Sequence, residues 1–305
     1  MNQMIVQKKI PAEAVDLYTR FIHGEIPRRE FLNGVQKYAV AGLTASAIVE
    51  ALMPNYALGQ QVRKDDERII ATYETVPSPD GHGYMKGYFV RPFSAISRTQ
   101  TPAKLPGVIV IHENRGLNPH TEDVARRFAL ENFVAFAPDA LSSVGGYPGD
   151  DYRGGELFAK LDPAKRTRDF VNVSRWLKAH AACNGKIGVT GFCFGGGMSN
   201  TLSTILGDEL GAAAPFYGGQ ARAEDASKIK AAILIHHGAL DKPLVDAYPA
   251  QEAALKANNV KHEGHMYPNS VHGFFNDATP ERYNRATAQQ AWTRTIDWFN
   301  QSLRT

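Results

Sequence analysis

Hydrophobic and polar positions follow two patterns along this chain, one typical of strands and one of helices, and the change between them predicts its secondary structure. From residue 107 onward, short apolar runs typical of buried strands alternate with stretches that place hydrophobic residues at helical spacing. The predicted strands are 107–112, 133–137, 187–190, 211–217, 231–238 and 260–267. The predicted helices are 121–132, 163–181, 196–206, 245–258 and 283–303. This alternation favours an α/β fold, a mostly parallel central sheet with helices on both faces.

The residues ahead of this alternation have other patterns. Residues 69–76 and 84–91 alternate apolar and polar side chains around the turn Pro79-Asp-Gly81, which predicts an antiparallel hairpin at the sheet edge. Residues 60–67 are predicted to be a polar linker, and 68–305 a single catalytic domain. The glycine-rich residues 138–156 are predicted to be a long loop that forms one wall of a substrate pocket.

Residues 1–60 are predicted to be a helical N-terminal extension. Residues 11–23 place hydrophobic side chains on one side of a helix, and 35–53 are Ala-rich and mildly apolar. The simplest arrangement is a helical hairpin that packs on the catalytic domain and stays attached. A stable membrane span is not expected, because no stretch approaches ~20 uninterrupted apolar residues.

A second interpretation of this extension is an export signal. Arg28 and Arg29, followed by Phe31 and Leu32, resemble a twin-arginine signal, with a small-residue cleavage site at 57–59. Pro27, the long leader and the charges of Lys37 and Glu50 argue against it. We therefore expect a cytoplasmic protein, with twin-arginine export to the periplasm as the alternative.

Composition excludes several classes of protein. The hydrophobic content of 43% and charged content of 21% are ordinary for a globular protein. The net charge of +3 is spread along the chain without a basic run, so no nucleic-acid partner is predicted. Two cysteines cannot build a disulfide framework, and both are expected to be reduced. His112-Glu113 lacks the second histidine of H-E-x-x-H, so no metal or other cofactor is predicted.

Candidate chemistry centres on Gly191-Phe-Cys-Phe-Gly195, which joins a predicted strand to a predicted helix. This is the Gly-x-nucleophile-x-Gly spacing of a nucleophile elbow, with Cys193 at its centre. The motif alone also fits an ordinary glycine-rich turn. Chain order favours catalysis, because Asp241 and then His272 each follow a predicted strand, which is the nucleophile–acid–histidine order of α/β-hydrolases.

From about residue 65 to the C-terminus the chain resembles the dienelactone hydrolase family. The motifs that support this resemblance are His112-Glu-Asn-Arg-Gly-Leu117, Ala137-Pro-Asp139, the segment 191–196, the segment around Asp241, and His272-Gly-Phe274. The resemblance implies an α/β-hydrolase fold with Cys193 as nucleophile, His272 as base and Asp241 as its orienting acid. It also implies that Glu113 contacts the resting thiol; otherwise, Glu113 pairs with Arg115 or another cation.

These residues predict hydrolysis of a small ester or lactone through a thioacyl-enzyme. His272 would take the thiol proton, and Asp241 would orient the imidazole. The backbone amides of Phe194 and Asn114 are predicted to hold the oxyanion. Rival interpretations are a thioesterase or acyltransferase on the same triad, or a ligand-binding or thiol-sensing protein without turnover. A monomer and a homodimer are both compatible with the sequence.

The predicted substrate wall is aromatic. Its members are Tyr147, Phe194, Tyr217, Phe274 and Phe275, although core packing is the alternative for at least two of them. Dienelactone hydrolases bind a carboxylated lactone with two arginines, and the matching positions here hold no arginine, although Arg153 lies near the first. We therefore expect a neutral ester or lactone.

Overall fold

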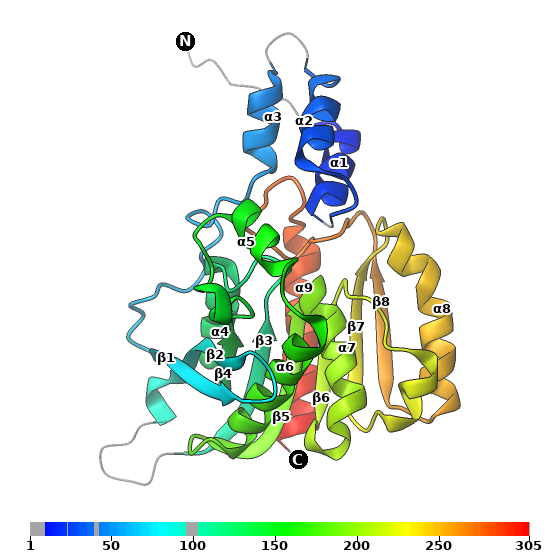
Figure 1. The fold of residues 1–305 in the computed structure, drawn as a ribbon. Coiled ribbons are helices and arrows are strands. Elements are labelled where there is room, and N and C mark those ends of the chain that lie inside the picture. Colours follow the sequence, from blue (N-terminus) through cyan, green and yellow to red (C-terminus); the bar gives the residue numbers. More distant parts are fainter. Residues whose placement is uncertain (1–9, 23, 40–42, 96–102, 305) are drawn as a thin grey trace.

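The computed structural model describes residues 10–22, 24–39, 43–95 and 103–304, which form an α/β body with a helical unit at one end (Figure 1). In this part of the chain, eight strands form one sheet in the order β1-β2-β4-β3-β5-β6-β7-β8. β1 pairs antiparallel with β2 at one edge, and β2 pairs antiparallel with β4. The six strands β3 to β8 are parallel to one another. The strands are β1 (Ile69–Ser78), β2 (Gly83–Pro92), β3 (Leu105–Ile111), β4 (Val134–Pro138), β5 (Cys183–Phe192), β6 (Ala212–Phe216), β7 (Ala232–Gly238) and β8 (His262–Tyr267).

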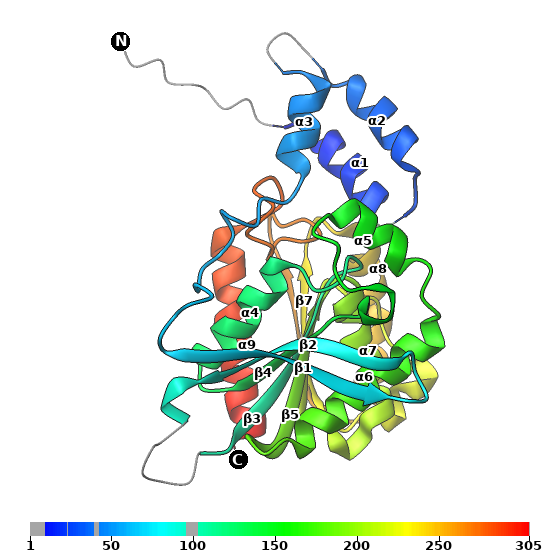
Figure 2. The same ribbon diagram turned by 60° about the vertical axis from the view of Figure 1, so that its left-hand side comes forward.

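Helices cover both faces of this sheet, as Figure 2 shows. They are α4 (Pro119–Leu130), α6 (Pro163–Ala179), α7 (Phe194–Leu206), α8 (Lys242–Ala257) and α9 (Arg285–Leu303). A further helix, α5 (Asp151–Phe158), lies at the end of the body that carries the helical unit. Short 3-10 turns lie at Phe93–Ala95, Ser142–Val144, Gly207–Glu209 and Ala223–Lys228. The mostly parallel sheet and the edge hairpin predicted from the sequence are confirmed.

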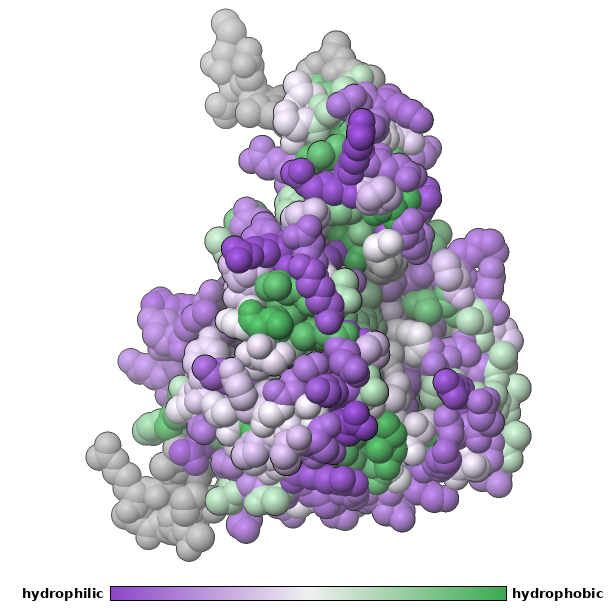
Figure 3. All heavy atoms as spheres, in the orientation of Figure 1, coloured by the Kyte–Doolittle hydropathy of each residue, from purple (hydrophilic) through white to green (hydrophobic). Residues whose placement is uncertain are grey.

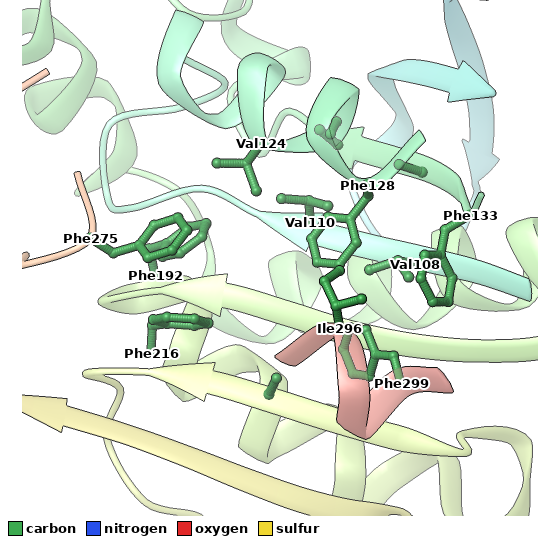
Figure 4. Close-up of a cluster of buried hydrophobic side chains, with 14 of the residues drawn as sticks. Val108, Val110, Val124, Phe128, Phe133, Phe192, Phe216, Phe275, Ile296 and Phe299 are labelled. Carbon is green, nitrogen blue, oxygen red and sulfur yellow. The ribbon is translucent and has the colours of Figure 1, made fainter. Parts of the chain in front are cut away.

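The apolar run of β3 is explained by burial on two sides. Val108 and Val110 belong to the hydrophobic cluster under α4 and α9, which Figure 4 shows in close-up. Ile109 and Ile111 belong to a second cluster under α6 and α7. Because successive strand residues point to opposite faces, a strand covered on both sides has no polar position.

Two predicted loops differ from the structure. Residues 138–156 are not one open loop, because Asp150 caps a helix, α5, by accepting a hydrogen bond from the Arg153 amide. Residues 60–67 are not a free linker. Val62 is buried, its amide donates to Asp123, and its carbonyl accepts from Arg126.

The described residues between 10 and 53, here called the N-terminal unit, form three helices instead of the predicted hairpin. They are α1 (Ala12–Ile22), α2 (Arg28–Gln36) and α3 (Ala45–Leu52). The unit has its own hydrophobic cluster, which includes Tyr18, Phe31 and Ile48. The predicted segment 11–23 ends in His23, and 35–53 includes 40–42; these four residues lie outside the described part.

Several contacts fasten the N-terminal unit to the body. The carbonyl of Ile22 accepts hydrogen bonds from the side chains of Asn114 at 2.9 Å and Arg115 at 2.7 Å. The ring of Phe21 stacks on Tyr152 with a centroid distance of 6.0 Å. The unit therefore lies against the loop that follows β3. None of the helices in the described residues is both long and apolar enough to cross a bilayer.

Candidate active site

Cys193 occupies the sharp turn between β5 and α7. Its φ of 54° and ψ of −111° are strained for a residue with a side chain. The flanking glycines permit the turn, since a Cβ on Gly191 would lie 2.4 Å from the backbone of Gly195. A Cβ on Gly195 would lie 2.3 Å from the carbonyl oxygen of Ile111. Cys193 thus lies in a tight, strained turn between a strand and a helix, which is the backbone shape of a nucleophile elbow.

The three triad candidates meet at the carboxyl ends of parallel strands. Cys193 follows β5, Asp241 follows β7, and His272 lies beyond β8. The Nδ1 atom of His272 is 2.6 Å from an oxygen of the Asp241 carboxylate. The side chains of His272 and Cys193 are also hydrogen-bonded. The imidazole therefore bridges the thiol and the carboxylate.

Backbone contacts fix the two loops that present the acid and the histidine. The amides of Ala239 and Leu240 donate to the carbonyls of Tyr267 and Ser270, at 2.8 and 3.0 Å. Gly238 permits this approach, because a Cβ there would lie 2.4 Å from the Ser270 carbonyl oxygen. The Asp241–His272 geometry is consequently built into the main chain.

The charge state of His272 depends on its neighbours. Burial alone lowers the pKa of this imidazole, but the Cys193 thiolate and the hydrogen bonds to Asp241 and Cys193 raise it to about 10. An imidazole with a raised pKa can take up a proton from a neighbouring thiol and keep it. The thiolate is the nucleophilic form of cysteine.

The loop after β3 is held rigidly beside this pair. His112 is fully buried and accepts a hydrogen bond from the Ala140 amide at Nε2, 3.0 Å away. The Asp139 carboxylate accepts hydrogen bonds from three backbone amides, those of Leu117, Leu141 and Tyr147. This network explains the Ala-Pro-Asp motif, and it positions Asn114. The other predicted oxyanion donor, Phe194, is the first residue of α7, where an amide lacks an intrahelical partner.

Glu113 is buried in the same loop. Its Oε1 atom has no hydrogen-bond partner in the described part of the chain. The guanidinium of Arg115, the cation named as its alternative partner, donates to the Ile22 carbonyl at 2.7 Å. A buried carboxylate oxygen without a hydrogen-bond partner lowers the stability of the folded protein.

A cavity of about 1100 Å³ opens from Cys193 and His272 toward the N-terminal unit. The surface is hollowed below the helices of that unit, beside α8 (Figure 3). Tyr217 and Phe194 line it, as predicted, and the Tyr217 ring lies 4.9 Å from that of His272. Tyr217 has a φ of 37°, and its buried hydroxyl has no hydrogen-bond partner among the described residues.

The rest of the predicted aromatic wall lies elsewhere. Phe274 and Phe275 are fully buried in the core and are absent from the described cavity lining. Tyr147 donates its hydroxyl to Asp151 at 2.7 Å and does not line the cavity. No described residue from 138–156 lines it either, so the prediction of a pocket wall there is wrong.

Two contributions to the cavity were missed in the sequence. One is α1 of the N-terminal unit, whose inner surface faces the triad. The other is Arg166, whose guanidinium lies 4.3 Å from the centre of the Phe158 ring and 4.7 Å from that of Phe194. Burial lowers the pKa of Arg166, opposed by Asp162. The spacing of Arg166 and the buried Phe170, one helical turn apart, could have indicated that Arg166 lies on the inner side of α6.

Among the described residues, no group of three or more His, Cys, Asp or Glu side chains is arranged to hold a metal ion.

A mostly parallel sheet of eight strands in the described residues, with an elbow after β5 and an acid and a histidine after later strands, defines an α/β-hydrolase. Residues 93–303 match the sequence profile of the Dienelactone hydrolase family. The chain belongs to that family, and it is an ester hydrolase.

Individual relatives agree with this assignment. A candidate carboxymethylenebutenolidase of Escherichia coli O157:H7 is 30% identical over 256 residues, which are 79% of this chain and 90% of that protein. The hydrolase fragment YghX of Escherichia coli K12 is 53% identical over 121 residues, 40% of this chain and 98% of the fragment. The crystal structure of a candidate dienelactone hydrolase from Klebsiella pneumoniae is similar with a TM-score of 0.65 and 28% identity, covering 76% of this chain and 99% of that one.

Proposed function

We propose that this protein hydrolyses a carboxylic ester or lactone with Cys193 as nucleophile, His272 as general base and acid, and Asp241 as the group that orients His272. The observation that supports this most is the position of the His272 imidazole, hydrogen-bonded on one side to Asp241 and on the other to Cys193. A positioned nucleophile, a base and a third group that orients the base are the elements of such catalysis.

In the proposed reaction the Cys193 thiolate attacks the ester carbonyl carbon, and the carbonyl oxygen becomes an oxyanion. The amides of Phe194 and Asn114 stabilise that charge, each donor contributing about 2.7–4 kcal/mol of barrier lowering. As the tetrahedral intermediate collapses, the C–O bond breaks and His272 gives its proton to the leaving alkoxide. Water, deprotonated by His272, then attacks the thioacyl carbon and releases the acid, and the thiol is restored.

Glu113 has a proposed role in the resting enzyme. Its buried carboxylate would contact the Cys193 thiol and accept or return its proton as substrate enters. The orphaned Oε1 atom supports this role, because a structural carboxylate at that depth would be expected to have a partner.

A short-chain nitrophenyl ester assay on the wild type and on Cys193→Ala tests the proposal. We expect a loss of kcat of several orders of magnitude in the variant without unfolding, since residue 193 lies in a turn whose strain the smaller side chain tolerates equally. Cys183→Ala is the matched control, because Cys183 is the other free cysteine and lies at the start of β5. Equal activity in wild type and Cys193→Ala would remove Cys193 from the mechanism.

We also propose that the N-terminal unit is retained in the mature protein and that the protein is cytoplasmic. The contacts of Ile22 and Phe21 with the body support retention, because cleavage at 57–59 would strip one side of the cavity. Mass spectrometry of the expressed chain should find residues 10–53. A mature chain starting near residue 60 would contradict this and favour the twin-arginine interpretation of Arg28 and Arg29.

A further inference from the structure

The cavity is larger than a small lactone requires. Its volume of about 1100 Å³ is at the upper end of the roughly 300–1,000 Å³ that holds drug-sized ligands. Only Cys193, His272 and their immediate surroundings are needed for the chemistry of a carbonyl group. The remaining space is large enough to hold another part of the substrate.

Apolar side chains from two separate elements line that remaining space. Ile10 and Val15 face it from the N-terminal unit, Leu240 faces it from the loop just before α8, and Leu244 faces it from the first turn of α8. Leu240 keeps 62% of its surface exposed. Charged residues also line the cavity, among them Asp16, Arg166 and Glu281. Two other charged members of the lining form ion pairs, Arg20 with Glu25 and Lys242 with Asp246. Figure 3 shows hydrophobic surface on this side of the molecule.

The side formed by the N-terminal unit is fixed in place. Two hydrogen bonds from Asn114 and Arg115 hold the end of α1, and the guanidinium of Arg282 lies 5.3 Å from the centre of the Tyr18 ring. Tyr18 is only 3% exposed. The surface opposite α8 is thus preorganised, and a preorganised surface loses little entropy when a ligand binds.

We propose that the space between Val15 of α1 and Leu244 of α8, here called the α1–α8 subsite, binds a medium-length aliphatic acyl chain of the substrate ester. This inference rests on the proposed function, since it places the ester carbonyl at Cys193. The N-terminal unit is then a specificity-determining part of the enzyme. Each methylene that becomes fully buried strengthens binding roughly fourfold, so chain length should control kcat/KM.

The test compares p-nitrophenyl acetate with p-nitrophenyl octanoate. For the full-length wild type, we expect kcat/KM for octanoate to exceed that for acetate at least tenfold. Val15→Asp and Leu244→Asp each place a charge in the α1–α8 subsite, and each should lower the octanoate-to-acetate ratio at least tenfold. Ile205→Asp is the matched control, because Ile205 is an exposed residue of α7 that does not line the cavity, and its ratio should equal that of the wild type.

The outcomes separate the subsite from the chemistry. A wild-type ratio near one, or ratios unchanged in both cavity variants, would overturn the α1–α8 subsite even if Cys193→Ala abolishes hydrolysis of both esters. If Cys193→Ala hydrolyses both esters as fast as the wild type while Val15→Asp still lowers the ratio, the subsite stands and the proposed nucleophile falls. Both esters are measured on the same preparation, so partial unfolding lowers both rates equally. The octanoate-to-acetate ratio then stays unchanged, and unfolding cannot be mistaken for the loss of the subsite.

Discussion

At the scale of single residues, His272 decides in which pH range the site is charged. An ordinary histidine has a pKa near 6.5, and here the Cys193 thiolate raises it to about 10 in spite of burial. A raised pKa means that the imidazolium stabilises the native state fully below pH ~6.5, and that this contribution is lost as the pH rises through about 10.

Removing the thiol should therefore lower the pKa of His272. Burial lowers the pKa of His272, and Cys193 makes the largest contribution that raises it. Cys193→Ala removes this contribution and leaves that of Asp241, so the pKa of His272 should fall clearly below about 10. Titration of the imidazole by NMR measures this directly. Cys183→Ala should leave the His272 titration unchanged, and an unaltered pKa in Cys193→Ala would show that the two side chains are not coupled.

At the scale of elements, the segment around α5 shows where sequence reasoning fails. Gly154 and Gly155 lower the helix propensity of this segment, so the sequence predicts a loop where the structure has a helix. In the structure both glycines lie against Arg115, and a Cβ on Gly154 would be 2.3 Å from its carbonyl oxygen. Packing against a distant loop selects glycine there, and no local pattern in 138–156 reveals that contact.

The link between Arg115 and α1 gives a prediction for the N-terminal unit. Arg115→Met removes the charged hydrogen bond to the Ile22 carbonyl, which is worth about 1.5–3 kcal/mol. Amide hydrogen exchange in 12–22 should then accelerate roughly 10- to 100-fold if α1 exchanges by local opening.

Arg175→Met is the control for this experiment, because Arg175 forms an exposed ion pair with Glu209 on the opposite side of the body. It should leave exchange in α1 unchanged. Unaltered exchange in Arg115→Met would mean that the N-terminal unit is held by its other contacts alone.

At the scale of the whole molecule, one buried network joins parts of the chain that are distant in sequence. Asp277 accepts hydrogen bonds from Gln61 at 2.7 Å and from Arg127 at 2.5 Å, and it lies 2.9 Å from the Nδ1 atom of His120. Burial alone raises the pKa of Asp277, but His120 and Arg127 lower it to about 2. The network therefore fastens the segment that follows His272, in which Asp277 lies, to Gln61, His120 and Arg127.

Asp277→Asn should destabilise the protein by about 1.5–3 kcal/mol at pH 7, because charged hydrogen bonds are lost. A carboxylate with a lowered pKa stabilises the native state above its ordinary pKa, and this contribution is lost as the pH falls toward about 2. The difference in the free energy of unfolding should therefore narrow below pH ~4. Urea denaturation across this range measures it.

Asp246→Asn is the comparison, since its pair with Lys242 is largely exposed and should be worth less than about 1 kcal/mol. A difference between wild type and Asp277→Asn that stays constant down to pH 2.5 would contradict an ionic role for Asp277.

Some features could be predicted from the sequence and others could not. The difference depends on whether a feature is set by neighbouring residues or by contacts between distant segments. The strands, the elbow and the order of Cys193, Asp241 and His272 depend on local patterns and on chain order, and the structure has them close to the predicted positions. The burial of Phe274 and Phe275 and the cavity lining on α1 depend on contacts between distant segments. Aromatic side chains after a catalytic histidine suit a pocket and a core equally well, so only the packed fold distinguishes them.

The N-terminal unit has a consequence for biosynthesis. Its helices leave the ribosome before the body does, yet Tyr18 and Ile22 lie against Arg282 and Arg115, and Arg282 is made long after α1. Translation proceeds at about 5–20 residues per second, so the segments that α1 packs against are synthesised on the order of ten seconds or longer after α1 itself. During that interval only the hydrophobic cluster within the N-terminal unit can shield the apolar side chains of α1, and the contacts with the body form later.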